Sequence, residues 1–404
     1  MSAQARSGAA RPVQARVVWD PDFTRYDFGP THPMAPLRLD LTARLCGALG
    51  LFDPRHVHVA GATPADDALL TTVHDADYVA AVRRASERPD EADQERGLGT
   101  EDDPAFLGMH EASARIVQGT VDVAEAVWSG EAHHGVNFCG GLHHAMRGRA
   151  SGFCVYNDAA VAIQRLLDLG AERVAYVDVD VHHGDGVQSI FWDDPRVLTI
   201  SVHESGRVLF PGSGFPDEVG GPHAPGSAVN VALPPGTGDA AWLRAVHSVV
   251  PALVHAFEPD VLVSQHGCDS HFLDPLAHLA VSVDAQRAVQ LMVHELAHGS
   301  VRGRWVALGG GGYEIVDVVP RSWSHLVGVA AHTPVDPLVE VPQAWREHVV
   351  RLLGRPGPAH MGDGRDTWFR SWEVGYDPDD AVDRAVMRTR KAVFPLHGLD
   401  PWFG

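Results

Sequence analysis

Two hydrophobic patterns alternate along the chain: short continuous apolar runs, and apolar residues recurring every three or four positions. The short runs predict buried strands at 16–19, 173–181, 197–202, 261–264 and 305–308. Helical spacing predicts helices over 110–128, 157–169, 242–257, 285–298 and 314–331, the last with an irregularity at Pro320. Strands separated by helices predict the α/β class, with a single open parallel sheet and helices on both faces.

Three segments lack these hydrophobic patterns: the two ends of the chain and an internal charged stretch. Residues 1–15 are small, polar and Arg-rich, so we expect them to be disordered. Residues 86–104 carry many charges and few apolar side chains, which indicates a long surface loop. The Pro-rich segment 333–404 is expected to be a tail packed on the same body. Since neither an internal repeat nor a linker is visible, we predict one domain over 16–404.

Composition narrows the class of protein. Of the 404 residues, 45% are hydrophobic and 21% charged, which is typical of a soluble enzyme. The formal net charge of −20 argues against a nucleic-acid partner, which would require a basic face. No run of about 18 apolar residues exists, and no signal-peptide core begins the chain, so we expect a cytoplasmic protein without membrane contact. The four cysteines form no CxxC pair, which favours structural thiols.

Candidate chemistry is densest in Val177–His183, VDVDVHH. In a strand, Asp178, Asp180 and His182 would project from one face. Burying two carboxylates and an imidazole together is costly unless a cation compensates their charge. Asp and His are suitable ligands for zinc or iron(II). A polar strand end facing solvent is the alternative, but the apolar flanks disfavour it.

A catalytic zinc usually has three protein ligands, so a third residue is required. Asp269 is the best candidate because it follows a predicted strand directly after Gly267. His266 and Asp274 compete for this role, although His266 fits a packing residue better.

The pair His143–His144 lies in a Gly-rich segment, where both rings can approach one cavity. A neutral histidine can take a proton from water, and a carboxylate behind it fixes its tautomer. Asp178 and Asp185 are available for that second task. A His-His pair alone is a weak signal: His133–His134 lies in a polar stretch, where we expect solvent exposure.

Two further motifs require comparison with known patterns. GGGGY, at 309–313, resembles a phosphate loop, but Glu314 stands where GxGxxG requires glycine. We therefore expect the glycines to let the backbone run close to a site, with Tyr313 as a donor to a developing oxyanion. HELAH, at 294–298, matches the HExxH motif of zinc proteases. The HxxGxxH extension is absent, and a protease is the less favoured interpretation.

Taken together, the chain resembles the zinc-dependent histone deacetylase superfamily in its class I-like branch. The matching blocks occur in order and are HPMAPLR (32–38), GGLHHA (140–145), ASGFCVYND (150–158), YVDVDVHHGDGV (176–187), FPGSG (210–214), GCD (267–269) and GGGGY (309–313). QHGCDSHFLDPLAHL is most similar to the zinc loop of bacterial acetoin-utilisation deacetylases.

The resemblance implies an arginase/deacetylase fold and a role for each matching residue. The implied zinc ligands are Asp180, His182 and Asp269. The implied catalytic residues are His143 and His144, paired with Asp178 and Asp185 respectively, and the oxyanion donor Tyr313. The implied substrate-binding residues are Gly152, Phe153, Phe210 and Gly311 around an acyl-lysine slot, and Asp102 at its rim. Arg38 and Gly140 would line an acetate channel. A structural potassium ion would use Asp178, Asp180, His182, Ser201 and Val202.

Several of these implied roles have plain structural alternatives. Phe153 and Phe210 could be core aromatics, Arg38 could form a surface ion pair, and Asp102 could be a solvated residue of a charge run. The chain also departs from the family: Leu209 stands where many class I members have a second Phe, and the 86–104 rim is longer and more acidic.

The implied function is zinc-dependent hydrolysis of N-ε-acetyl-lysine in proteins, with release of acetate. Either histidine of the pair could be the general base. The expected partner is an acetylated protein, such as an acyl-CoA synthetase. The alternative is a deacetylase of the same fold that acts on an acetylpolyamine or another small amide. A reader of acyl-lysine without turnover would need neither Tyr313 nor the three ligands.

Overall fold

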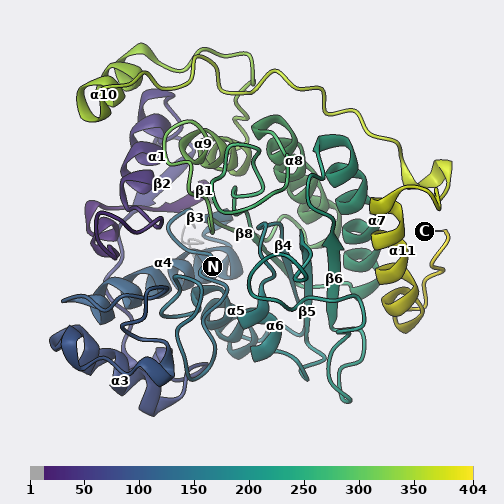
Figure 1. The fold of residues 1–404 in the computed structure, drawn as a ribbon, viewed down its shortest axis with the longest axis horizontal. Coiled ribbons are helices and arrows are strands. Elements are labelled where there is room, and N and C mark those ends of the chain that lie inside the picture. Colours follow the sequence, from purple (N-terminus) through teal and green to yellow (C-terminus); the bar gives the residue numbers. More distant parts are fainter. Residues whose placement is uncertain (1–12, 404) are drawn as a thin grey trace, which may run out of the picture.

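The computed structural model describes residues 13–403. Their strands form one eight-stranded sheet (Figure 1). Every neighbouring pair of strands is parallel, in the order β2-β1-β3-β8-β7-β4-β5-β6. The strands are β1 (Val13–Val18), β2 (Val57–Ala60), β3 (Ala132–Asn137), β4 (Val174–Asp178), β5 (Val197–Glu204), β6 (Ala228–Leu233), β7 (Val261–Gln265) and β8 (Trp305–Leu308).

Helices cover both faces of this sheet, as the alternating pattern predicts. α4 (Met109–Ser129) contacts α5 (Asp158–Asp168), and this pair lies below the sheet in Figure 1. On the opposite face, α9 (Val319–Ala330) contacts α1 (Leu37–Ala48) and α8 (Val283–Ser300), and α8 contacts α7 (Asp239–Phe257). The N-terminal half also contains α3 (Ala76–Glu87) and two short helices, α2 (Asp67–Leu70) and α6 (Asp185–Ile190). The predicted fold class is confirmed.

The predicted strand at 173–181 is too long, because β4 ends at Asp178. Beyond it, side chains accept the backbone N–H groups that a neighbouring strand would otherwise bind. Asp178 Oδ1 accepts from Asp180 N at 3.2 Å, and Asp180 Oδ1 accepts from His182 N at 2.9 Å. The carboxylates that make this segment chemically distinctive therefore also end the strand.

The predicted helix at 314–331 begins later, at Val319. The Glu314 side chain accepts the backbone N–H groups of Val316 and Asp317 and holds a turn before the helix. Pro320 lies in the first turn of α9, where a missing N–H costs no helical hydrogen bond, so it causes no irregularity.

Three strands were not predicted, and β3 is the most instructive of them. Its sequence, AHHGVN, reads as polar, yet all of it except His133 is buried. β3 pairs with β1 and β8 and so lies inside the sheet. The expectation that His133 and His134 are both exposed is wrong for His134, which is completely buried.

The charged segment 86–104 is only partly a free surface loop. α3 extends to Glu87, and two short 3₁₀ helices follow at Pro89–Glu91 and Gln94–Arg96. Leu98 and Asp103 are buried, so this segment is anchored to the protein beneath it.

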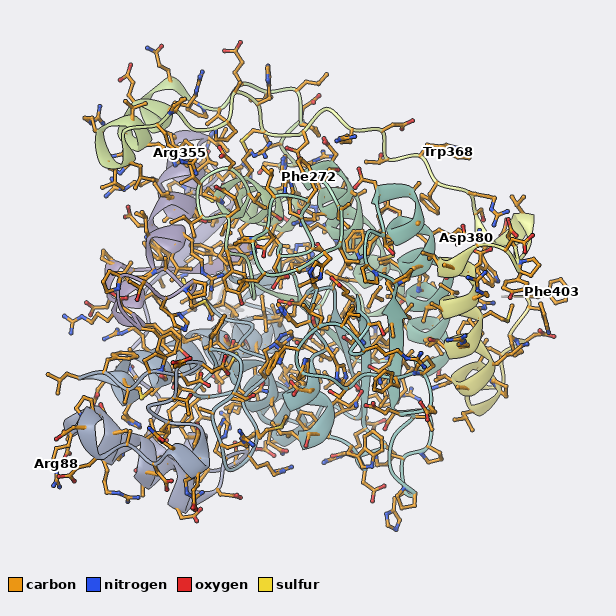
Figure 2. All side chains as sticks on the ribbon, viewed as in Figure 1. Arg88, Phe272, Arg355, Trp368, Asp380 and Phe403 are labelled. Atoms are coloured by element: carbon orange, nitrogen blue, oxygen red, sulfur yellow. The ribbon has the colours of Figure 1, made fainter. Side chains whose placement is uncertain are left out.

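The C-terminal segment contains two helices, α10 (Gln343–Leu353) and α11 (Ala381–Val393). α11 packs on α7, where buried Asp383 accepts from Arg244 Nε at 2.6 Å and Nη2 at 2.8 Å. The chain between the helices crosses the surface, where Trp368 is exposed (Figure 2). The expected disorder of 1–15 fails for residues 13–15, which belong to β1, and residues 1–12 lie outside the described part. A single domain over 16–404 stays a prediction.

Within residues 13–403, one helix, α7, is long and apolar enough by composition to cross a membrane. It contacts β4, β5 and α8 in the protein, and 56% of its apolar window is buried there. Packing in the core accounts for its composition.

Candidate active site

Asp180, His182 and Asp269 converge beyond the carboxyl ends of β4 and β7. His182 Nδ1 lies 3.1 Å from Asp180 Oδ1 and 3.1 Å from Asp269 Oδ2. All three side chains are buried, and their ligand atoms lie within 4.8 Å of one another. In parallel sheets, ligands bind at this edge.

The outer oxygen of each carboxylate is already bound by the protein. Asp180 Oδ2 accepts from Gly311 N at 2.8 Å and from Gln265 Nε2 at 2.7 Å. Asp269 Oδ1 accepts from Val181 N at 2.9 Å. These bonds orient the remaining oxygens toward His182, as outer hydrogen bonds orient metal ligands in general.

The charges of the buried carboxylates also favour a divalent cation between Asp180, His182 and Asp269. Burial and the Asp180 charge raise the pKa of Asp269 to about 6. Although burial opposes protonation, Asp180 and Asp269 raise the pKa of His182 to about 10, so a proton is held between two carboxylates. A divalent ion would replace that proton and balance both negative charges, and the Asp₂His donor set suits zinc or iron(II).

The two competitors for the third ligand have other partners. His266 Nε2 lies 2.8 Å from Ser264 Oγ, and its ring packs on Trp305, as expected of a packing residue. Asp274 Oδ2 accepts the backbone N–H of Tyr313 at 2.9 Å. Asp274 therefore positions the loop after β8.

The tandem histidines lie beside these ligands, each with its own carboxylate. His143 Nδ1 donates to Asp178 Oδ2 at 2.7 Å, and His144 Nδ1 donates to Asp185 Oδ1 at 2.6 Å. Although burial opposes protonation, Asp178 and Asp180 raise the pKa of His143 to about 9. Burial and the neighbouring His143 lower the pKa of His144 to about 4. These opposite shifts favour a protonated His143 beside a neutral His144.

A narrow pocket joins these groups to Tyr313. Tyr313, Gly311, Gly152 and Met34 line it together with both histidines, Asp180 and His182. The Tyr313 ring stands edge-on to Phe153, with centroids 5.7 Å apart. Burial and the charge of Asp269 raise the pKa of Tyr313 well above 10, so the phenol keeps its proton.

Glycine is required at two walls of this pocket. A side chain at Gly311 would collide with the carboxylates of Asp269 and Asp180. At Gly152, which has φ +58°, it would collide with the His144 ring. These positions let the backbone approach the chemistry closely.

Asp102 is an anchored residue of the rim. Its Oδ2 accepts from Gly152 N at 2.7 Å, and its carbonyl accepts from His32 Nε2 at 3.2 Å. Phe153, which follows Gly152 in the chain, has a φ of 65° and is half-buried. Asp102 therefore holds the loop that positions Phe153.

Phe210 contacts the site from another loop. Its ring lies edge-on to His144 and to His182, with centroid separations of 5.0 and 6.3 Å. With 44% of its surface exposed, it is not a core aromatic. Leu209 beside it is partly buried against the core.

Arg38 is buried, which excludes a surface ion pair as the explanation for this residue. Its Nη1 donates to Gly310 O at 2.9 Å and to Gly312 O at 3.1 Å, directly behind the glycine run. Gly140 borders a neighbouring polar cluster, in which Asp158 accepts the backbone N–H groups of Gly141 and Leu142.

Of the five residues implied in potassium binding, Asp178 ends β4, Asp180 and His182 follow it, and Ser201 and Val202 lie within β5. Asp178 and Ser201 are paired in the strand register. Asp178 Oδ2 also accepts from Tyr176 Oη at 2.8 Å, and Ser201 Oγ lies 2.8 Å from His203 Nδ1. Val202, Asp180 and His182 are buried nearby.

Sequence reasoning missed three supporting polar residues: Gln265, Tyr176 and Asp158. Each lies inside a segment that resembles the family, but neither its residue type nor its spacing marks a supporting role. Gln265 could have been found, since a glutamine ending a buried strand requires a partner.

The HELAH pair does not approach Asp180. His294 and His298 lie in α8 and contact His134 and His332, with ring centroids between 4.6 and 5.3 Å apart. The four cysteines, Cys46, Cys139, Cys154 and Cys268, are free and buried.

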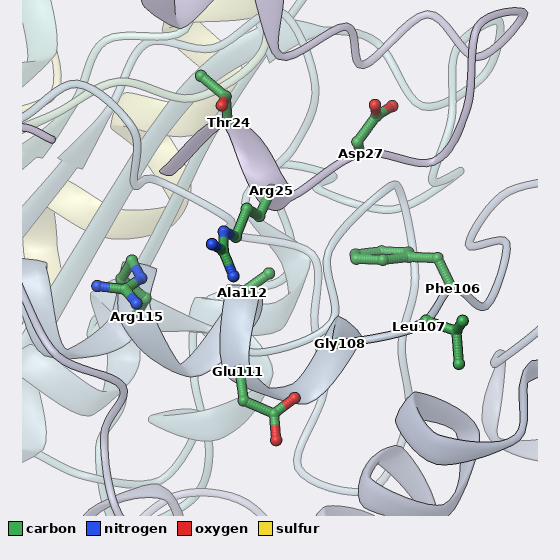
Figure 3. A pocket seen from close by; sticks show the side chains of 9 residues that line it. All are labelled: Thr24, Arg25, Asp27, Phe106, Leu107, Gly108, Glu111, Ala112 and Arg115. Carbon is green, nitrogen blue, oxygen red and sulfur yellow. The ribbon is translucent and has the colours of Figure 1, made fainter. Parts of the chain in front are cut away.

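A larger pocket opens at the surface between a 3₁₀ helix, Pro21–Arg25, and the start of α4 (Figure 3). Its volume is about 630 Å³, and Arg25, Asp27, Glu111 and Arg115 line it. Arg115 forms an ion pair with Asp22 at 3.2 Å. None of the predicted catalytic residues borders it, so the narrow pocket is the candidate active site.

Comparison with known proteins agrees with this geometry. The histone deacetylase domain matches residues 32–330, which include every candidate site residue. Acetoin utilization protein AcuC of Bacillus subtilis (strain 168) is 43% identical over 332 residues, covering 81% of this chain and 84% of that protein. The proteins of the same name from Staphylococcus xylosus and Staphylococcus aureus (strain MSSA476) are 39% and 38% identical, covering 81% and 86% of this chain and 85% and 90% of their own lengths. The chain therefore belongs to the histone deacetylase family of amide hydrolases, in the branch of its acetoin-utilization relatives.

Proposed function

We propose that this protein is a zinc-dependent lysine deacetylase, which hydrolyses the acetyl amide of N-ε-acetyl-lysine in proteins. The observation that carries the proposal is the convergence of Asp180, His182 and Asp269 with the paired histidines in one narrow pocket. Asp180, His182 and Asp269 would hold the metal, with iron(II) as a possible substitute for zinc. When bound, the metal would supply Lewis-acid polarisation of the amide carbonyl and acidify water.

The two histidines divide the proton transfers. His144 is neutral and accepts the proton of the attacking water, while Asp185 holds its tautomer. His143 remains protonated beside Asp178 and donates to the leaving lysine amine. The proposal therefore takes His144 as the general base, a choice that the sequence leaves open and that the lowered pKa of His144 supports.

Tyr313 donates a hydrogen bond to the oxyanion that develops on the acetyl carbonyl. Its phenol is protonated, and Asp274 holds its backbone in place. One donor of this kind typically contributes about 10²–10³ in rate.

Two accessory roles follow from the surroundings. Arg38, buried behind the glycine run, would attract the acetate product into a channel near Gly140. A potassium ion held by Asp178, Asp180, His182, Ser201 and Val202 would stiffen the ends of β4 and β5.

The substrate is proposed to be an acetylated protein of the cytoplasm, such as an acyl-CoA synthetase. Phe153 and Phe210 would flank the neutral lysine stem, and Gly152 and Gly311 leave room for it. The net charge of −20 and the acidic rim suit a cationic protein surface. The names of the curated relatives connect them with acetoin utilization, in keeping with a metabolic substrate.

Small acetylated amines, including acetylpolyamines, are the competing substrate class. The test is a side-by-side assay of the zinc-loaded protein on an acetyl-lysine peptide, an acetylated protein and an acetylpolyamine. We expect the highest kcat/KM on the peptide or protein. Faster turnover of the acetylpolyamine would favour the small-molecule alternative.

A further inference from the structure

Four histidines from three parts of the chain meet at the end of the sheet opposite the candidate active site. His134 lies in β3, His294 and His298 lie one turn apart in α8, and His332 follows α9. All six pairs of ring centroids are between 4.6 and 5.3 Å apart, as at the corners of a nearly regular tetrahedron. One nitrogen from each ring lies within 4.8 Å of the others.

His134 shows that this cluster is more than stacked rings. It is completely buried, and its Nδ1 donates to the carbonyl of Ala330 at 2.6 Å. That bond fixes the tautomer and leaves a lone pair on Nε2, which has no hydrogen-bond partner. His294 Nε2 is also buried without a partner. Buried polar atoms almost always have partners, so two unpaired imidazole nitrogens in one cluster indicate a missing partner.

His332 reaches the cluster through an unfavourable backbone conformation. Its φ is 56°, at the position after α9 where glycine or asparagine is usual. Its N–H still bonds to Val329 O at 3.1 Å, so helix capping does not depend on the imidazole. Simple packing does not explain a histidine here, whereas convergence with His134 and His294 does.

We propose that His134, His294, His298 and His332 form a second metal site, which binds one zinc ion through four imidazoles. Four nitrogen donors around one point match the tetrahedral geometry of zinc, whereas magnesium and calcium require oxygen ligands. The bond from His134 Nδ1 to a carbonyl is the usual second partner of a zinc-bound imidazole.

This site is separate from the catalytic one and has a different task. In the sheet, His134 lies opposite Trp305, which is the first residue of β8. The glycine run of the active site follows Leu308, which is the last residue of β8, so the two sites lie at opposite ends of this strand. Four imidazoles fill a zinc shell and leave no open position, which is typical of a structural site. The ion would join β3 to the C-terminal ends of α8 and α9. The HELAH motif would then bind metal without any peptidase chemistry.

The test is zinc stoichiometry of the full-length protein. The wild type, the double variant His298→Gln/His332→Asn and the control His255→Ala are stripped with chelator, loaded with zinc(II), desalted and analysed by elemental mass spectrometry. His255 is an exposed histidine of α7 outside the cluster. We expect about two zinc ions per chain in the wild type and control, and about one in the double variant, with kcat/KM on an acetyl-lysine peptide unchanged.

Asn tolerates the conformation at residue 332, so the double variant is expected to fold. Circular dichroism and melting of the metal-free proteins check this. The proposal also predicts that zinc(II) raises the Tm of an Asp180→Ala variant, and that adding the double substitution abolishes that rise. One zinc ion in the wild type, two in the double variant, or an Asp180→Ala variant whose Tm does not respond to zinc would each overturn it.

Discussion

The Nε2 atoms of His143 and His144 lie 3.0 Å apart, although a different carboxylate holds each ring from behind. A hydrogen bond between two imidazoles requires one donor and one acceptor, so the pair carries one proton between them at this contact. The raised pKa of His143 and the lowered pKa of His144 favour His143 as the donor and His144 as the acceptor. This difference gives the first prediction.

The zinc-loaded enzyme should show a bell-shaped dependence of kcat/KM on pH. Activity requires His144 unprotonated, so it is lost as pH falls toward about 4, and requires His143 protonated, so it is lost as pH rises through about 9. Asp178→Asn removes a charge that raises the pKa of His143 and should move the alkaline limb to lower pH. The matched variant Asp185→Asn should move the acid limb to lower pH. If both limbs stay in place in both variants, the two histidines have been assigned wrongly.

Replacing Tyr313 by Phe should lower kcat by about 10²–10³ and change KM little, because the phenol bonds to the oxyanion and not to the ground state. Steady-state kinetics together with zinc content will show this. Since Tyr313 is not a metal ligand, the variant should keep its metal. Near wild-type turnover would exclude the phenol as a donor.

Gly311→Ala should abolish catalytic metal binding, because the added methyl group would displace the carboxylates of Asp269 and Asp180. Gly47→Ala is a matched control, since nothing lies within 4 Å of the position its methyl group would take. Zinc content and kcat/KM are measured for both. A Gly311→Ala protein with normal metal and activity would mean that the close approach of the glycine loop is unimportant.

Acetyl-lysine peptides with flanking Arg should be hydrolysed faster than those with flanking Glu, owing to the net charge of −20. The preference should shrink as salt rises, because exposed charges are screened over about 8 Å at physiological ionic strength. Asp102→Ala should raise KM for peptides more than for a minimal acetyl-lysine amide. Equal rates on both peptides at low salt would remove charge as the basis of selectivity.

Two of the three candidate ligands, Asp180 and His182, are predictable from sequence because carboxylates and histidine at alternate positions are conspicuous after an apolar run. The strand ends before Asp180, yet Asp180 and His182 still converge, since the bonds that end the strand also orient them. The alternation of side chains along a strand does not by itself predict that Asp180 and His182 converge.

Other parts of the site leave little trace in the sequence. Gln265 and Asp158 act through side-chain hydrogen bonds to groups distant in sequence, which only the folded chain reveals. His134 reads as a surface residue because its neighbours are polar, and its burial depends on β1 and β8, which are distant in sequence. Long-range pairing decides burial there.

The central claim is that one metal held by Asp180, His182 and Asp269 hydrolyses an acetyl-lysine amide. The most direct measurement is acetate released from an acetyl-lysine peptide by the zinc-loaded wild type, the metal-free protein, and the variants Asp180→Ala, His182→Ala and Asp269→Ala. The account predicts about one acetate per free lysine amine with the loaded wild type, and rates near background for the metal-free protein and all three variants. Acetate release that persists in the folded variants, or none from the loaded wild type, would contradict it.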